Sequence, residues 1–217
     1  MRGGNGVGRG MRVIETEADL AAGLAALLAR EPRFAEALAV AGEVPLRRNR
    51  GGFAALLETI ISQQVSLAAA AAIRARMQAA GLWKAAAIRA AGEERLREAG
   101  LSRPKARYVA AVAAARLDYR ALAGLGDAEV RARLIALPGI GRWSAEIYLL
   151  QSLGRADVFP AGDLALQEAT RRLFALPARP TEPEMRRLAA GWAPERAVAA
   201  RLLWAYYGVV KDQGRGR

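Results

Sequence analysis

Apolar residues recur at helical spacing along most of the chain. Leu20, Leu24 and Leu27 lie three or four positions apart and form one stripe, and a second stripe begins at Phe53 and continues toward Met77. Residues at this spacing share one face of a helix, which can pack on a core. No stretch alternates apolar and polar residues for long enough to predict a sheet. The pattern therefore predicts an all-α protein.

Glycine and proline residues divide these stripes into roughly ten helices joined by short connections. We expect one helical unit over residues 13–212, in which residues 52–137 form a central layer. The remaining terminal segments are expected to form a second lobe, with a cleft between the two packed lobes. Residues 1–12 and 213–217 lack apolar periodicity and are predicted to be disordered tails.

The chain has no cysteine or histidine among its 217 residues. Disulfides, thiolate nucleophiles, cysteine-ligated zinc or iron–sulfur clusters and imidazole catalysis are therefore excluded. Charged residues interrupt the apolar stretches before they reach the roughly 18 residues that a membrane span needs, and no hydrophobic signal core begins the sequence. We expect a soluble, cytoplasmic protein with no catalytic metal or cofactor.

Basic residues exceed acidic ones by 33 to 21, which gives a formal net charge of +12. Such an excess favours a polyanionic partner, because each neutralised phosphate releases condensed counterions. Nucleic acid is the leading candidate. All but three of the basic residues are arginine, so a general arginine-rich composition explains the charge as well. Charge alone leaves both interpretations open.

The most informative segment is residues 134–150, which read LIALPGIGRWSAEIYLL. One predicted helix ends before a turn at Gly139, Ile140 and Gly141, and a second helix begins near Arg142. The glycines leave the turn's N–H groups unobstructed, so a phosphate can bind at the helix start, where the helix dipole favours an anion. Ile140 is expected to fill the gap between the helices. An ordinary αα-corner is the alternative interpretation.

At these residues the sequence resembles the helix-hairpin-helix DNA glycosylases, and among them the DNA-3-methyladenine glycosylase II family. The segment LPGIGRWSAEIYLL, residues 137–150 of the expected helix-hairpin-helix at 127–151, and the downstream segment DVFPAGDLAL, residues 157–166, carry the resemblance most specifically. Weaker matches are ISQQVS at 61–66, SRPKARY at 102–108 and WAPER at 192–196. The resemblance spans most of the chain. It implies base excision repair of double-stranded DNA that contains alkylated bases.

The resemblance also implies the type of reaction. Relatives that cut the abasic strand use a lysine in the second helix of the hairpin, and Trp143 matches that position here. None of the three lysines lies near the hairpin in sequence. We therefore expect a monofunctional glycosylase without β-lyase activity, acting as a monomer with no protein partner. A monovalent cation on the hairpin's backbone carbonyls is a further expectation from the resemblance.

Asp163 is the candidate catalytic residue. An aspartate at the start of a helix is a good N-cap, and this structural role explains the residue by itself. By resemblance, Asp163 matches the family's catalytic aspartate, and both roles are compatible when one oxygen faces the cleft. Cleavage of an N-glycosidic bond develops positive charge on the sugar, so a nearby carboxylate stabilises the transition state more than the ground state.

Trp143 and Trp204 resemble the two tryptophans that form the family's base pocket. A base flipped out of the duplex needs new stacking surfaces, and indole faces attract a cationic ring. Trp204 also continues an apolar stripe, so packing in the core is the alternative for this residue. Because no histidine is present to protonate a neutral base, cationic purines such as 3-methyladenine and 7-methylguanine are the expected substrates.

Two further residues are predicted to contact DNA. Gln64 matches the position at which family members insert a side chain into the gap left by the flipped base, while Gln63 is an alternative that would hydrogen-bond within the helix junction. Lys105 is expected to bind a phosphate, although a solvated lysine is also compatible with the sequence.

Two other functions stay open: a non-catalytic helix-hairpin-helix DNA-binding protein, and a helical scaffold or transcription regulator whose basicity is compositional.

Overall fold

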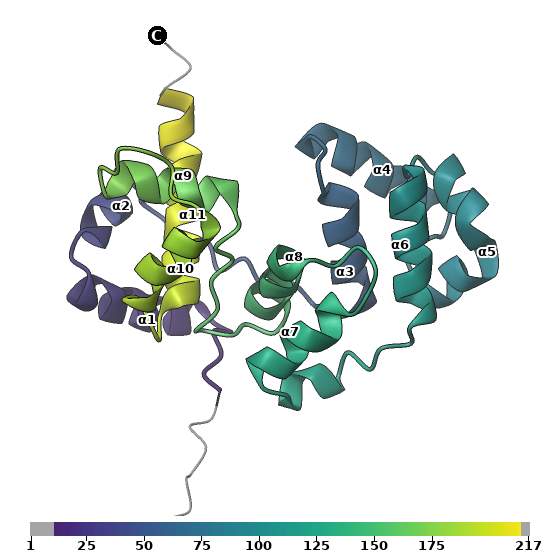
Figure 1. The fold of residues 1–217 in the computed structure, drawn as a ribbon, viewed down its shortest axis with the longest axis horizontal. Coiled ribbons are helices and arrows are strands. Elements are labelled where there is room, and N and C mark those ends of the chain that lie inside the picture. The colour runs from purple at the N-terminus through teal and green to yellow at the C-terminus, as the bar shows by residue number, and fades with distance from the viewer. Residues whose placement is uncertain (1–10, 214–217) are drawn as a thin grey trace, which may run out of the picture.

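The computed structural model describes residues 11–213, and its regular structure within that range is helical (Figure 1). It contains eleven α-helices, where the sequence predicted roughly ten. In chain order they are α1 (Glu17–Arg30), α2 (Phe34–Ala41), α3 (Gly52–Ser62), α4 (Leu67–Ala79), α5 (Ala85–Glu98), α6 (Arg103–Ala114), α7 (Asp127–Ile135), α8 (Arg142–Ile147), α9 (Leu164–Leu173), α10 (Glu182–Ala190) and α11 (Arg196–Gln213). The predicted all-α fold class is confirmed.

The helices form two lobes, each with its own hydrophobic core (Figure 1). The first lobe combines both ends of the described chain, because α1 and α2 pack with α9, α10 and α11 around residues such as Leu27, Phe34 and Leu203. The second lobe contains α3 to α8 around residues such as Leu57 and Val109. The middle of the chain thus forms one body, and its flanking segments form the other.

The predicted tails lie largely outside the described residues. Two positions within them are nevertheless structured. Arg12 forms an ion pair with the buried Glu195, and its carbonyl accepts a hydrogen bond from Ala156 N at 3.0 Å. Helix α11 continues through Gln213. Apolar periodicity does not detect a single charged anchor such as Arg12, and the remainder of both predicted tails, residues 1–10 and 214–217, stays a prediction.

A buried arginine ties together segments from both lobes. Arg201 in α11 is 0% exposed, and its guanidinium donates to the carbonyls of Leu46, Ala197 and Leu150 at 2.7, 3.0 and 3.1 Å. Burial lowers the pKa of Arg201 to about 10, and the charges of two neighbouring arginines lower it to a smaller extent. The guanidinium is therefore charged at neutral pH. Leu46 lies in the connection between α2 and α3, and Leu150 lies just after α8. One side chain therefore holds three segments that are distant in sequence.

Candidate active site

Asp163 lies at the N-terminal end of α9, where it is partly buried. Its Oδ1 accepts hydrogen bonds from the backbone N–H groups of Ala165 and Leu166, both at 3.0 Å. These donors are among those that the first turn of a helix leaves free. The N-cap that the sequence favoured is therefore present. Leu164, the next residue, is 61% exposed, so this end of α9 faces solvent.

Two tryptophan side chains complete the surroundings of this carboxylate. Trp143 Nε1 donates to Asp163 Oδ2 at 3.0 Å, and Trp204 Nε1 donates to Oδ1 at 3.2 Å. Within the described residues, Asp163 accepts four N–H hydrogen bonds and forms no ion pair with a lysine or arginine. The carboxylate is therefore held in one orientation by N–H donors and not by an ion pair. Three donors occupy Oδ1 and one occupies Oδ2, so Oδ2 has room for a further ligand.

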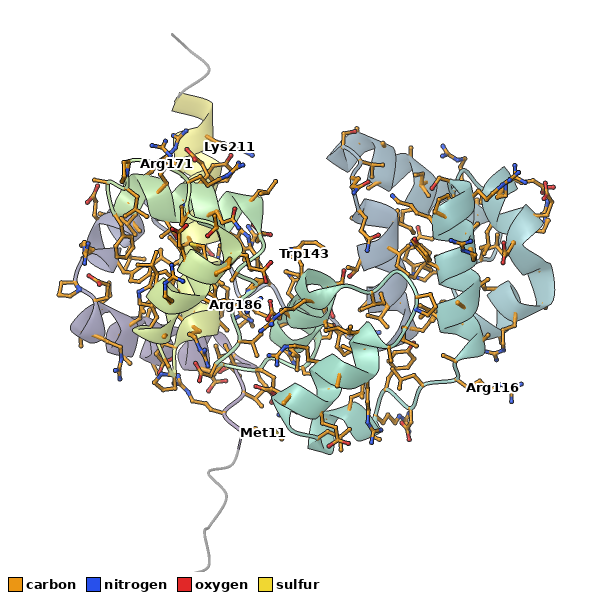
Figure 2. All side chains as sticks on the ribbon, viewed as in Figure 1. Met11, Arg116, Trp143, Arg171, Arg186 and Lys211 are labelled. Carbon is orange, nitrogen blue, oxygen red and sulfur yellow. The ribbon has the colours of Figure 1, made fainter. Side chains whose placement is uncertain are left out.

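The two tryptophans come from different lobes. Trp143 lies on α8 of the second lobe, and Trp204 lies on α11 of the first lobe beside the core. Figure 2 shows Trp143 projecting from α8 between the two lobes. Both indole rings are partly exposed, so each offers some surface to a ligand. Trp204 therefore combines the two predicted possibilities, because it packs against the core and also bonds Asp163.

The hairpin between α7 and α8 requires a glycine at its first turn position. Gly139 has a φ of 79°, and a Cβ added there would lie 2.4 Å from Tyr108 Cγ. Such an approach is too short for any side chain, so the backbone of the turn can pack directly on the Tyr108 ring only when this residue is glycine. The tight turn predicted from the sequence is present for this reason.

The next three hairpin residues have different surroundings. Ile140 is 3% exposed and belongs to the core of the second lobe, as expected for a residue that fills the gap between the helices. A DNA contact by Ile140 would therefore have to use its backbone. Gly141 is exposed and directly precedes the first residue of α8. A Cβ added to Gly141 would meet no atom within 4 Å. The Arg142 side chain is 52% exposed, so the start of α8 is open to an anion.

The junction between α3 and α4 approaches the hairpin through Gln63. Its Nε2 donates to the carbonyl of Gly139 at 3.0 Å and to Ser144 Oγ at 3.5 Å. Gln64 is exposed and has a φ of 53°, a left-handed conformation that is uncommon for residues other than glycine. Gln63 thus joins this junction to the hairpin, and Gln64, the next residue, is exposed at the junction.

Lys105, the expected phosphate contact, binds backbone carbonyls of its own chain, and its contact with a phosphate stays a prediction. Its Nζ donates to the carbonyls of Ile61 and Gln63, both at 2.7 Å, at the C-terminal end of α3. Burial lowers the pKa of Lys105. The ammonium group therefore caps carbonyls that the helix end leaves without intrahelical partners. Sequence reasoning missed this role because it depends on how α6 packs against α3.

A buried carboxylate near the hairpin was also missed. Glu146 is 1% exposed, and Arg142 and Arg186 form ion pairs with it at 3.1 and 3.0 Å, while Arg131 approaches to 3.6 Å. Arg186 belongs to α10, so this network links the hairpin with the first lobe. The only signal in the sequence was one acidic residue within the otherwise apolar run AEIYLL.

The described residues hold no group of three or more acidic side chains that could bind a metal ion. The monovalent cation expected on the hairpin carbonyls stays a prediction, and one of those carbonyls, that of Gly139, already accepts the Gln63 amide.

Along residues 11–213, none of the helices combines the length and the apolar composition needed to cross a membrane. The predicted cytoplasmic location stays a prediction.

Comparison with known families agrees with this geometry. A model of the HhH-GPD superfamily base excision DNA repair protein matches residues 57–195, which include the hairpin and Asp163. The chain belongs to the HhH-GPD superfamily. The resemblance inferred from the hairpin and the aspartate segment is therefore confirmed. Trp204 lies beyond the matched residues, so the superfamily match covers Asp163 and one of its two indole partners, Trp143.

Curated relatives of this superfamily match parts of the chain. The putative DNA-3-methyladenine glycosylase YfjP of Bacillus subtilis is 29% identical over 173 residues, which are 74% of this chain and 60% of that protein. DNA-3-methyladenine glycosylase 1 of Schizosaccharomyces pombe is 41% identical over 80 residues, 37% of this chain and 35% of that protein. The chain therefore spans less than two thirds of the length of these relatives.

Solved structures match more completely. The DNA-3-methyladenine glycosidase of Bacillus halodurans superposes with a TM-score of 0.76 at 31% identity and covers 94% of this chain and 95% of its own. The 3-methyladenine DNA glycosylase Mag1 of Schizosaccharomyces pombe, in complex with abasic DNA, has a TM-score of 0.76 at 29% identity and covers 84% of this chain and 95% of its own. The two-lobed helical architecture is therefore that of known glycosylases.

Proposed function

We propose that this chain is a monofunctional DNA glycosylase that excises alkylated, positively charged purines such as 3-methyladenine and 7-methylguanine from duplex DNA. The observation that carries the proposal is the carboxylate of Asp163, which two indole N–H groups and a helix start hold in place without an ion pair among the described residues. The names of the matching glycosylases and the presence of abasic DNA in one of them support the same conclusion.

DNA binding is assigned to the hairpin and to the adjacent helix junction. The N–H groups at Gly141 and Arg142 are open to a backbone phosphate, and the net charge of +12 favours binding to a polyanion. Gln64 is exposed at a junction that Gln63 ties to the hairpin. A side chain in that position can occupy the space that a flipped nucleotide leaves in the duplex.

The flipped base then stacks against the indoles of Trp143 and Trp204. The bond between C1′ and the base nitrogen breaks, and its electron pair leaves with the base, which becomes neutral when the purine was cationic. The sugar acquires positive charge, which the Asp163 carboxylate stabilises. Asp163 Oδ2 accepts a proton from a water molecule while the water oxygen bonds to C1′. An abasic site and a free base result.

Strand cleavage at the abasic site is not part of the proposed reaction. A Schiff base would need an unprotonated lysine beside C1′, and Trp143 stands where lyase-type relatives carry that lysine. Lys105 donates its hydrogen bonds to two carbonyls at the end of α3.

Every side chain assigned to the reaction comes from one copy of the chain, so a monomer on DNA is sufficient.

Substitution of Asp163 by asparagine tests this proposal. An attraction between unit charges about 4 Å apart at an effective dielectric of 20 is about 4 kcal/mol. Its loss corresponds to a decrease of roughly a thousandfold in rate. We expect Asp163→Asn to bind DNA almost normally and to release methylated purines roughly a thousandfold more slowly, as measured by chromatography of bases freed from methylated DNA.

Asp118→Asn is the matched control, because Asp118 also caps backbone N–H groups, those of Arg120 and Ala121, but is exposed and forms no hydrogen bond with either indole. Near-normal base release by Asp163→Asn would contradict the catalytic assignment. Salt-dependent DNA binding without any base release by the unmodified chain would instead identify a non-catalytic DNA-binding protein.

A further inference from the structure

A guanidinium group lies over the indole of Trp204, the ring whose N–H bonds Asp163. Arg47 Cζ is 6.0 Å from the centroid of that ring, which is within the range of a cation–π interaction. Arg47 is exposed and belongs to the connection between α2 and α3. No carboxylate within residues 11–213 forms an ion pair with it. An acidic neighbour therefore does not explain where this side chain lies.

The residues on both sides of Arg47 are anchored to distant parts of the chain. The carbonyl of Leu46 accepts a hydrogen bond from the buried Arg201 at 2.7 Å, and Arg48 Nη1 donates to the carbonyl of Gln151 at 3.1 Å. Arg47 itself has a φ of 50°, a left-handed conformation that persists in residues other than glycine only where the surroundings require it. Its neighbours are thus anchored, while Arg47 is turned toward the indole.

The distance between Arg47 Cζ and the centroid of the Trp204 ring is greater than that of two groups in direct contact. Contacting planar groups lie about 3.5 Å apart, so a base held between two of them needs about 7 Å. Arg47 Cζ, 6.0 Å from the ring centroid, would have to move outward by at least about 1 Å to admit a base, and its side chain is exposed and can move. Both guanidinium planes and aromatic rings stack on unpaired bases in nucleic-acid-binding proteins.

We propose that Arg47 forms the wall of the base pocket opposite Trp204 and reduces the preference of the pocket for cationic over neutral purines. The proposal rests on the glycosylase function proposed above and adds a residue that determines its specificity. Asp163 attracts a cationic purine, whereas the guanidinium of Arg47 repels it. A neutral purine forms a favourable cation–π contact with the same guanidinium. Arg47 thus extends the substrate range toward neutral lesions such as hypoxanthine.

Binding of two free bases that differ in charge tests the proposal independently of catalysis. The probes are neutral 9-methyladenine and 3,9-dimethyladeninium, which is cationic at neutral pH, and quenching of tryptophan fluorescence reports their affinities. In Arg47→Ala, the ratio of cationic to neutral affinity is expected to rise about threefold to tenfold. Arg47→Lys retains the charge but not the plane, so it should weaken binding of the neutral probe without strengthening that of the cation.

Arg50→Ala is the matched control, because it removes the same charge from an exposed position in the same connection. Its ratio of affinities should equal that of the unmodified chain. An unchanged ratio in Arg47→Ala, or failure of both probes to bind the unmodified chain, would overturn the proposal.

Base excision provides the second measurement. Release of 7-methylguanine from methylated duplex relative to release of hypoxanthine from duplex containing deoxyinosine should rise in Arg47→Ala by the same factor as the binding ratio. Equal decreases for both substrates, together with a weaker salt dependence, would make Arg47 a phosphate contact and reject the proposed specificity role. Absence of any base release by the unmodified chain, with the expected binding ratio, would reject the glycosylase function and leave the pocket assignment standing.

Discussion

At the scale of single residues, the two oxygens of Asp163 have different surroundings. Oδ1 receives two backbone N–H groups and the Trp204 indole, while Oδ2 receives the Trp143 indole alone. The helix start therefore fixes one oxygen, and a side chain from the other lobe orients the second. This division explains how one carboxylate can cap a helix and still present an oxygen to a ligand.

The two indoles should consequently differ in importance for the reaction. Trp143→Phe keeps an aromatic surface but removes the only donor that Oδ2 has within residues 11–213, so kcat is expected to fall about tenfold, the value of one oriented hydrogen bond to a charged group. Trp204→Phe leaves two donors on Oδ1, and a decrease of less than about threefold in kcat is expected. Single-turnover base release measures both. Equal decreases in the two variants would show that hydrogen bonding to Oδ2 has no special role.

At the scale of elements, the hairpin is held by contacts with helices outside it. Gly139 packs against the ring of Tyr108 on α6, and its carbonyl accepts the amide of Gln63 at the end of α3. Lys105 on α6 binds the carbonyls at that same helix end. The turn, the α3–α4 junction and α6 thus form one rigid unit beside the start of α8.

Gly139→Ala tests this unit. The added methyl would lie 2.4 Å from Tyr108 Cγ in a residue with a φ of 79°, so we expect the free energy of unfolding to fall by about 2 kcal/mol. Affinity for undamaged duplex should also decrease, since the turn must move. Urea denaturation and salt-dependent binding measure the two effects.

The control for this variant is Gly141→Ala, which places its methyl in open space at a φ of −86° and should change stability by less than about 0.5 kcal/mol. In a Gly139→Ala background, Tyr108→Gly removes the Cβ, Cγ and Cδ2 atoms that the added methyl would meet, so it should cost less stability than it does in the unmodified chain. A normal urea midpoint for Gly139→Ala alone would contradict the packing of the turn on Tyr108.

At the scale of the whole molecule, the site exists only where the two lobes meet. Trp143 approaches Asp163 from the second lobe, while Glu146 and Arg186 join the same two bodies next to it. Arg201 adds a buried link between the connection after α2, the segment after α8 and α11. Relative placement of the lobes therefore controls the geometry of the carboxylate.

Arg201→Met should disturb that placement. Three carbonyls would lose their donor in a fully buried position, and the expected decrease in the free energy of unfolding is about 3 to 5 kcal/mol. Chemical denaturation measures the change, and Arg187→Met, at an exposed position on α10, is the control. Stability equal to that of the control would show that the carbonyls find other donors.

The sequence by itself determined the features that depend on nearby residues. Apolar spacing predicted the helices, the two glycines predicted the turn before α8, and Asp163 was recognisable as a helix cap because capping involves only the next few positions. The order of the hairpin and the aspartate segment was sufficient to indicate the superfamily. These properties follow from local geometry, which a linear pattern records.

Tertiary structure alone decided which atoms meet. Asp163 receives indoles from residues 20 and 41 positions away, and Lys105 binds carbonyls more than 40 positions before it. Arg47 lies over Trp204, and the segments on either side of it are anchored to distant parts of the chain. Such contacts depend on the packing of whole helices, and helical periodicity specifies a buried face without specifying its partner.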